Sequence, residues 1–307
     1  MPPPVRHLLF ALAFVGLYWV GGVFGNQLIV GQDAVVLLWP PGALSFALLL
    51  HRGRRWWPLI AASDLVFSLT GTSVPAVFIP FTMAANTLAA FAGTTIVRAV
   101  GGLEVQRFDF RALRAMALGA LGFAFVTTAF GVTGLVLAGF TTVEGAPVAA
   151  ATWFISNIFG VLVIVPALAL LFAKGTGEGG GPRRRLGESA TWLACLLGAL
   201  LVVATVDGES VRNALATLAL PTTVLLWGAM RVPSKWLASG TLATGLGLAV
   251  VAAREEGAVL RPSSTFEAFL LLLLLVTLAV APLLVGPPCA RSAASRASPS
   301  PWPAPTP

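Results

Sequence analysis

The chain has 307 residues, of which 57% are hydrophobic and only 10% are charged, and its mean hydropathy is +0.89. A soluble domain carries about a quarter charged residues, so this composition excludes a globular protein with a polar surface and predicts an all-α polytopic membrane protein. The net charge of +7 does not indicate nucleic-acid binding, because the basic residues fall in short clusters between apolar segments, as they do in membrane proteins.

Ten apolar segments have roughly the 17 to 25 residues that a membrane-crossing helix needs. They lie near residues 8–25, 34–50, 57–73, 76–97, 115–139, 149–173, 190–206, 213–230, 237–253 and 265–285. The first follows Arg6, as the apolar part of a signal peptide would, but we expect an uncleaved first span. The chain is therefore expected to form about ten transmembrane helices.

The second segment opens on the sequence WPPG at residues 39–42, which places two prolines and a glycine inside an apparent span. The helix from Gly42 to Leu50 would be about 13 Å long at 1.5 Å per residue, less than half of a hydrocarbon core of roughly 30 Å. We therefore predict a Pro-broken span that descends partly extended from about Ala34 and becomes helical at Pro41. A helix that starts inside the bundle presents free N–H groups that favour an anion. A proline kink without a ligand is the alternative.

A basic turn with paired tryptophans follows the second segment. We interpret it as an anchor at the cytoplasmic face, formed by Arg52, Arg54, Arg55, Trp56 and Trp57. Tryptophan is enriched at membrane–water interfaces. The same interfacial position is expected for the tryptophans near the cytoplasmic ends of other predicted spans, which are Trp192, Trp227 and Trp236.

The third segment contains Asp64 near its middle. A charge at the bilayer centre costs roughly 2.5 to 3.5 kcal/mol on insertion scales, so a carboxylate there requires a partner. Asn86 in the fourth segment and Ser156 and Asn157 in the sixth lie at a similar depth and are candidate donors to it. Two interpretations stay open: a polar contact that holds the helices together, or a ligand or ion site.

The distribution of charge between the segments predicts the orientation of the chain. Both termini and the connections at 51–56, 98–114, 174–189 and 231–236 hold all of the 19 Lys and Arg residues except Arg212, Arg254 and Arg261. The opposite connections are rich in acidic residues. By the positive-inside rule, both termini are cytoplasmic. Residues 287–307, which follow the membrane domain at 1–286, are rich in Pro, Ser and Ala and are predicted to be disordered.

Catalysis is not expected, and neither is a metal or a cofactor. His7 and His51 lie at membrane edges, and Asp64 has no second carboxylate to form an aspartyl dyad. Cys195 and Cys289 fit neither a zinc spacing nor a disulfide framework. The Gly-rich connection at 174–189 lacks the Gly-Lys-Ser/Thr ending of a phosphate-binding loop.

Several stretches, taken in order, resemble a known family of bacterial membrane domains. They are Trp39-Pro40-Pro41 before an Ala/Leu span, Arg55-Trp56-Trp57-Pro58, Asn86-Thr87-Leu88, Trp153 followed by Ser156-Asn157, and the stretch PTTVLLWGAMR at 221–231. Over about residues 5–285 the chain resembles the membrane-associated sensor domain of type one in the MASE group. The resemblance implies an integral-membrane input module that precedes histidine kinase, PAS or diguanylate cyclase domains.

With the resemblance included, the candidate residues for a ligand or signal site are Trp39, Pro40, Pro41, Asp64, Asn86, Trp153 and Asn157. Asn157 stands where the family usually has Asp, and Asp64 stands where the family more often has a neutral polar residue. We hypothesise that the charge has moved to the neighbouring span. Family members usually continue into a cytoplasmic signalling domain, whereas a low-complexity tail follows here. We therefore expect either a separate partner polypeptide or a gene model that is truncated or frame-shifted.

We therefore expect a sensory input domain in the bacterial inner membrane that relays a periplasmic or membrane cue to a cytoplasmic histidine kinase or diguanylate cyclase by conformational change. The first alternative is a secondary transporter of a small solute that uses the broken second span and Asp64 as its midplane site. The second is a structural bundle that scaffolds another membrane protein. The expected partners are the lipid bilayer, a cytoplasmic signalling domain or membrane protein, and a second copy of the chain in a homodimer.

Overall fold

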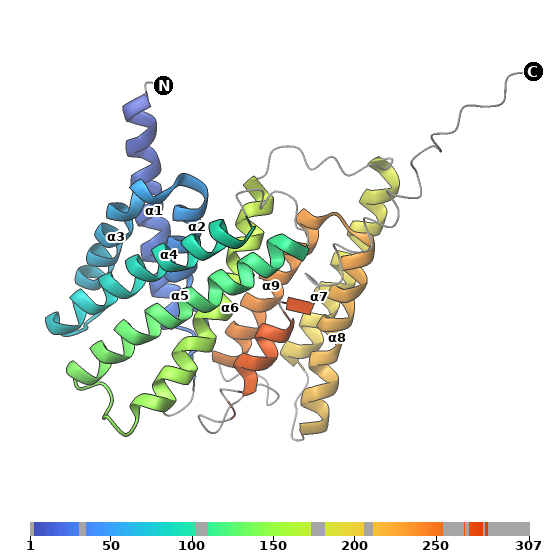
Figure 1. Ribbon diagram of the computed structural model, residues 1–307. Coiled ribbons are helices and arrows are strands. Elements are labelled where there is room, and N and C mark those ends of the chain that lie inside the picture. Colours follow the sequence, from blue (N-terminus) through green and yellow to red (C-terminus); the bar gives the residue numbers. More distant parts are fainter. Residues whose placement is uncertain are drawn as a thin grey trace, which may run out of the picture.

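The computed structural model describes residues 3–30, 35–101, 110–172, 182–205, 211–253, 267, 270–278 and 280–281. In these ranges the chain is helical apart from its connections and one very short β-ribbon (Figure 1). The helices are α1 (Pro3–Asn26), α2 (Pro40–Arg52), α3 (Trp57–Thr70), α4 (Ile79–Gly101), α5 (Phe110–Leu137), α6 (Ala146–Phe172), α7 (Pro182–Thr205), α8 (Val211–Arg231) and α9 (Ser234–Ala253). Residues 270–278 and 280–281 are helical as well, and short 3₁₀ turns cover Arg54–Trp56 and Ala76–Phe78.

The helices occur where the apolar segments predicted them, and the protein is an all-helical membrane protein. In the part of the chain that the structure describes, six helices are long and apolar enough to cross a membrane by themselves: Val5–Asn26, Ala76–Gly101, Arg111–Leu137, Ala146–Ala169, Gly187–Thr205 and Lys235–Ala253. Helices α2 and α3 have 13 and 14 residues, so each is about 20 Å long and shorter than a hydrocarbon core of roughly 30 Å. The number of ten crossings therefore stays a prediction.

The second predicted span is broken, as its prolines indicated, but its helix begins one residue earlier than predicted. Helix α2 starts at Pro40 rather than Pro41, with Trp39 as the preceding cap residue. Proline suits the first turn of a helix because its φ angle is already helical and its missing N–H is not needed there. Before the helix, β2 (Val35–Val36) pairs antiparallel with β1 (Ile29–Val30), and the chain continues without helical structure to Trp39.

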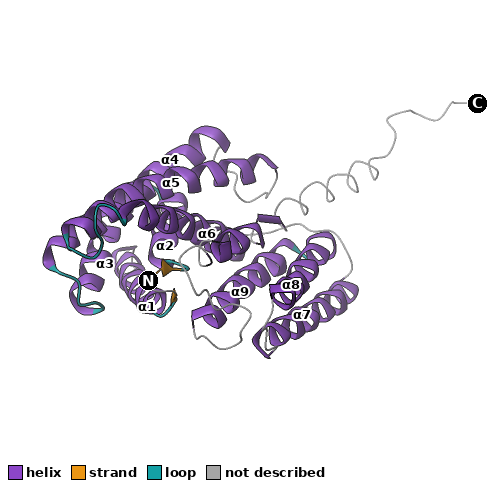
Figure 2. Cartoon of the chain, turned by 90° about the horizontal axis from the view of Figure 1, so that it is seen from below, coloured by secondary structure: helices purple, strands orange, loops and turns teal. Residues whose placement is uncertain are grey.

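Helix α2 lies inside the first group of helices, where α1, α4 and α6 pack around it (Figure 2). Every residue from Pro40 to Leu50 is buried. The long antiparallel pair α4 and α5 closes over α2 at two glycines: a Cβ atom at Gly93 would overlap the ring of Phe46 and lie 2.7 Å from the carbonyl oxygen of Gly119. Glycine is therefore needed where these three helices meet.

Helices α7, α8 and α9 form a second group that joins the first where α9 packs on α6 (Figure 2). Trp192 of α7 is fully buried between its neighbours, with its ring against Gly228 and Gly240. Its indole N–H donates to the carbonyl oxygen of Val224 at 2.9 Å. Trp192 is therefore not a lipid-facing anchor, because glycines on two neighbouring helices leave space for the ring inside the group. Its depth in the membrane stays a prediction. Trp227 and Trp236 are both partly exposed.

The outer surface of the helices is apolar. Large aliphatic and aromatic side chains such as Leu12, Leu69, Phe125 and Leu201 are exposed by 60 to 72% of their surface. A soluble protein rarely exposes so much contiguous apolar surface. These side chains are the ones that lipid covers in a membrane.

Candidate functional site

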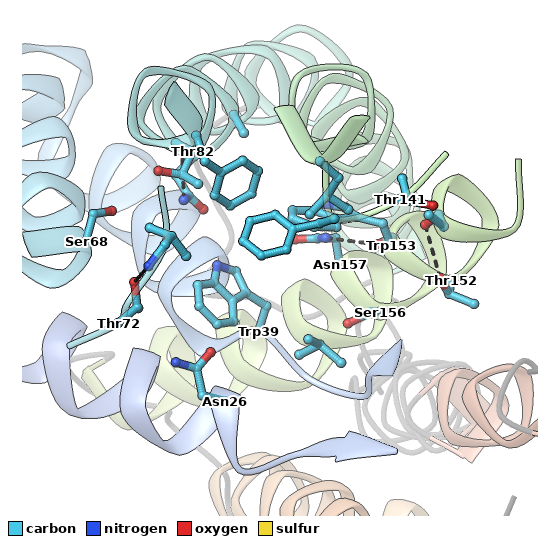
Figure 3. Close-up of a pocket in the computed structure, with 18 of the residues that line it drawn as sticks. Asn26, Trp39, Ser68, Thr72, Thr82, Thr141, Thr152, Trp153, Ser156 and Asn157 are labelled. Carbon is cyan, nitrogen blue, oxygen red and sulfur yellow. Dashed lines mark hydrogen bonds between the residues drawn. The ribbon is translucent and has the colours of Figure 1, made fainter. Parts of the chain in front are cut away.

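A cavity of about 580 Å³ lies among the first six helices. Its walls come from the ends of α1, α3 and α5, the starts of α4 and α6, the ribbon strand β2 and Trp39 (Figure 3). Because consecutive helices run in opposite directions, these helix ends all lie on one side of the bundle. The volume falls within the range of roughly 300 to 1,000 Å³ that is usual for small-molecule sites.

The cavity reaches well into the bundle. Asn86 lies seven residues after the start of α4 at Ile79, and Asn157 lies eleven residues after the start of α6 at Ala146. At 1.5 Å per residue these side chains lie roughly 10 and 16 Å from the ends of their helices. The inner wall of the cavity therefore lies roughly 10 to 16 Å from that side of the bundle.

Asp64 of α3 is at this inner wall and is only 1% exposed. Its Oδ1 atom accepts hydrogen bonds from the Tyr18 hydroxyl at 2.6 Å and the Asn86 amide at 2.8 Å, and its Oδ2 atom accepts one from the Thr82 hydroxyl at 2.6 Å. These bonds tie α1, α3 and α4 together around one carboxylate. Together the three donors satisfy both oxygen atoms of the Asp64 carboxyl group.

Asn157 and Ser156 of α6 lie on another part of the wall and do not bond to Asp64, contrary to the prediction from the sequence. The Asn157 amide donates to the carbonyl oxygen of Trp153 at 2.8 Å. Within the described part of the chain, the Asn157 Oδ1 and Ser156 Oγ atoms have no hydrogen-bond partner, and neither has Asn86 Oδ1. Unpaired polar atoms in a protein interior are uncommon and call for a functional or structural reason.

Five of the seven predicted site residues line this one cavity: Trp39, Asp64, Asn86, Trp153 and Asn157. The other two, Pro40 and Pro41, are buried in the first turn of α2 behind Trp39. Pro40 packs against α1, where a Cβ atom at Gly21 would lie 3.2 Å from its side chain. The fold thus gathers residues that are up to 118 positions apart in the sequence, from Trp39 to Asn157.

The sequence did not identify two of the three donors to Asp64, Tyr18 and Thr82. Tyr18 is the one tyrosine in the chain and lies in the middle of an otherwise apolar first span. A hydroxyl at that depth needs a partner, so this position was an available signal. Thr82 carried none, because threonine commonly bonds to its own helix backbone.

The anion considered for the start of α2 does not fit the cavity. Pro40 and Pro41 have no N–H groups, so the first turn offers fewer donors than other helix starts do. Asp64 is the one ionisable side chain among the lining residues that the structure describes. In the described wall, an anion would therefore meet an acidic side chain and no basic one.

The opposite end of α2 carries the predicted basic anchor. Arg98 of α4 donates to the carbonyl oxygen of Leu49 at 2.6 Å, which satisfies one of the last carbonyl groups of α2. The Arg52 guanidinium lies 4.3 Å from the ring centroid of Phe10 in α1, a cation–π contact. Gly53 then reverses the chain with a φ angle of 92°, a conformation that favours glycine.

The remaining anchor residues continue from this turn. Arg54 donates to the Thr95 hydroxyl at 2.8 Å, and the Trp56 ring packs edge-on against Phe10 with ring centroids 5.2 Å apart. Arg55 and Trp57 are exposed. The end of α2 is thus held by α1 and α4 while its basic side chains stay near the surface.

Comparison with models of protein families matches residues 8–287 to the family described as MASE1. The matched range covers nearly the whole chain and includes every residue of the cavity wall. No curated protein and no solved structure matches the chain. In the described ranges, no three His, Cys, Asp or Glu side chains come together in a way that would hold a metal ion.

Proposed function

Since the chain belongs to the MASE1 family of membrane sensory domains, we propose that it receives its cue in the cavity and passes the response along α2. The protein is a multi-pass protein of the bacterial inner membrane. The observation that carries the proposal is the position of α2, a short buried helix with the cavity at its start and the basic anchor at its end.

The orientation that supports this proposal has ten crossings and both termini in the cytoplasm. The charge distribution of the connections favours it. In that orientation the cavity faces the periplasm, and Arg52 and Arg98 lie at the cytoplasmic end of α2. A cue from the periplasm or the outer half of the membrane then reaches the cavity directly.

Helix α2 is suited to transmit a displacement. It is about 20 Å long, and its buried residues contact helices of the same group on every side. Closely packed interiors shift between discrete arrangements rather than deform smoothly. A cue that repositions Trp39 therefore moves the whole of α2 and changes the contacts of Arg52 with Phe10 and of Arg98 with Leu49.

The output in this proposal is a histidine kinase or a diguanylate cyclase in the cytoplasm, attached to the membrane domain or recruited as a separate polypeptide. The membership in a family of membrane sensory domains supports this role. The domain is proposed to act by shifting the population of two arrangements, without a chemical step.

A fusion tests the proposal. A diguanylate cyclase joined after Val285 should give a cyclic-di-GMP level that depends on the membrane domain. Trp39→Ala should change that level about fivefold or more, the low end of typical allosteric coupling. Trp236→Ala is the matched control, because Trp236 is 44% exposed and is not part of the cavity wall. Equal output from both variants, at equal protein levels, would contradict the proposal.

The alternative function is secondary transport, favoured by the broken helix next to a cavity that contains a carboxylate. It predicts solute uptake, driven by an ion gradient, into sealed vesicles that contain this chain alone. A sensor predicts a response of the fused cyclase and no such uptake. Gradient-driven uptake that Asp64→Asn abolishes would favour the transporter.

A further inference from the structure

Among the residues of the cavity wall that the structure describes, there is one acidic side chain and no basic one. Asp64 contributes a carboxylate, and none of the described lining residues is Lys, Arg or His. Its three partners, Tyr18, Thr82 and Asn86, satisfy its hydrogen bonds but are all neutral. A buried charge without an opposite charge nearby is costly, so a bound cation would relieve that cost.

Two amide oxygens add to the negative potential. The amide nitrogens of Asn86 and Asn157 each donate a hydrogen bond to an oxygen atom. These hydrogen bonds fix the orientation of each amide group and therefore the position of its Oδ1 atom. Both Oδ1 atoms are buried without a partner in the described chain. Each of these oxygen atoms is the negative end of an amide dipole on a residue that lines the cavity.

The rest of the wall is unusually aromatic. Trp39 and Phe67 pack edge to face with ring centroids 5.9 Å apart, and Phe78 and Phe140 do so at 5.7 Å. Trp153 contributes a further ring from α6 (Figure 3). Aromatic faces attract cations, tryptophan most strongly, and aromatic cages are a recurrent way to bind quaternary ammonium groups.

A negative charge also lies next to the cavity in the chain. Glu144 lies in the exposed connection between α5 and α6, next to the lining residue Gly145. Hydrogen bonds from its own backbone N–H and from the Thr142 hydroxyl lower the pKa of Glu144, so it is ionised at neutral pH. A negative charge at this position favours the approach of a cation over that of an anion.

From these observations we propose that the cavity binds a small organic cation with a quaternary ammonium group, using Trp39 and Trp153 as aromatic surfaces and Asp64 as the opposite charge. A quaternary ammonium fits better than a primary amine because both Asp64 oxygens already accept hydrogen bonds, which leaves little acceptor capacity for further N–H donors. The proposal names the cue for the cavity and so rests on the proposed sensory function.

Choline and its neutral isostere 3,3-dimethyl-1-butanol provide a direct test. They have nearly the same shape and differ in the charge at one atom. Thermal unfolding of the purified full chain should show a saturable rise in Tm with choline and none with the alcohol. Equal shifts with both compounds, or no saturable shift with choline or tetramethylammonium, would overturn the proposal.

Substitutions of lining residues test whether choline binds in the cavity. Trp39→Ala should weaken choline binding roughly tenfold, from the loss of one desolvated cation–π contact, and Asp64→Asn should weaken it at least as much. The control is Thr133→Ala, on the exposed side of α5, which should bind like the wild type. If Asp64→Asn does not fold, Trp39→Phe and Trp153→Phe keep the packing and should each still weaken binding, since Phe attracts cations less than Trp does. Unchanged binding in all of these variants would overturn the assignment.

The cation site and the sensory role of the cavity can be refuted independently of each other. If choline binds but the cyclase fused after Val285 does not respond to it, the cation site stands and the sensory role of the cavity fails. If Trp39→Ala changes the cyclase output but no quaternary ammonium binds, the sensory role stands and the cation proposal fails.

Discussion

Removal of one hydroxyl group, by Tyr18→Phe, measures how strongly the Asp64 cluster holds α1 to α3. Tyr18 is fully buried, and its hydroxyl donates to Asp64 Oδ1 at 2.6 Å. Phenylalanine keeps the ring and its packing against Phe14, whose centroid lies 6.1 Å away. The substitution therefore removes the hydrogen bond to Asp64 and the contact of the same hydroxyl with Ser45, and it leaves the packing of the ring in place.

Two general magnitudes bracket the expected loss. A hydrogen bond to a charged group contributes about 1.5 to 3 kcal/mol in proteins. Polar contacts between membrane helices average about 0.6 kcal/mol and reach about 1.7. Asp64 keeps the hydrogen bonds from Thr82 and Asn86 in the variant, so the carboxylate is not left bare. We expect a loss of about 1.5 kcal/mol, or roughly a tenfold shift in the unfolding equilibrium.

The assay is equilibrium unfolding of the purified protein by a denaturing detergent, followed by tryptophan fluorescence. Thr133→Val is the control, because its hydroxyl bonds only within α5, to the Ala129 carbonyl oxygen, and is exposed. A double-mutant cycle with Asp64→Asn isolates the coupling between the two side chains. If Tyr18→Phe is as stable as the control, or if the cycle shows no coupling, the hydrogen bond does not hold α1 in place.

Three further predictions concern other contacts. Gly93→Ala should destabilise the fold by about 1 to 3 kcal/mol because the added methyl group overpacks against α2 and α5. Gly198→Ala is the control and should not destabilise the fold, because a Cβ atom there meets nothing within 4 Å. Equal melting temperatures of the two variants would refute the close packing at Gly93. Trp192→Ala should cost about 3 to 5 kcal/mol, measured by the same unfolding assay, and an anchor at the lipid interface would lose far less. Asp64→Asn should impair assembly of the protein or the output of the fused cyclase. Adding Asn157→Asp should partly restore the lost function, since both residues line the cavity. If Asp64→Asn changes neither assembly nor output, the hypothesis that the charge has moved between these positions is contradicted.

The break in the second span shows how far the sequence determines local structure. Two prolines and a glycine in an apolar segment required an interruption there, because proline cannot occupy a helix interior without loss of a hydrogen bond. The helix starts at Pro40 instead of Pro41, directly after the chain has left the β-ribbon and lined the cavity at Trp39. Both prolines fit a first turn, so the sequence alone did not distinguish them.

The partners of Asp64 show where sequence reasoning stopped. The cost of a charge in lipid made it certain that Asp64 needs partners, and Asn86 was identified because an amide at similar depth stands out. Tyr18 and Thr82 were missed because no local pattern states which helices are neighbours. Conversely, Ser156 and Asn157 have a suitable depth but lie on a different wall of the cavity.

The sequence by itself determined the class of the protein, the positions of its helices and the break before α2, because hydropathy, charge and proline geometry act along the chain. The tertiary structure decided which side chains meet: the donors around Asp64, the ring of Trp192 between two glycines, and the aromatic wall of the cavity. Those contacts depend on the packing of helices that lie far apart in the sequence, and packing is set by shape complementarity between surfaces, which no single segment contains.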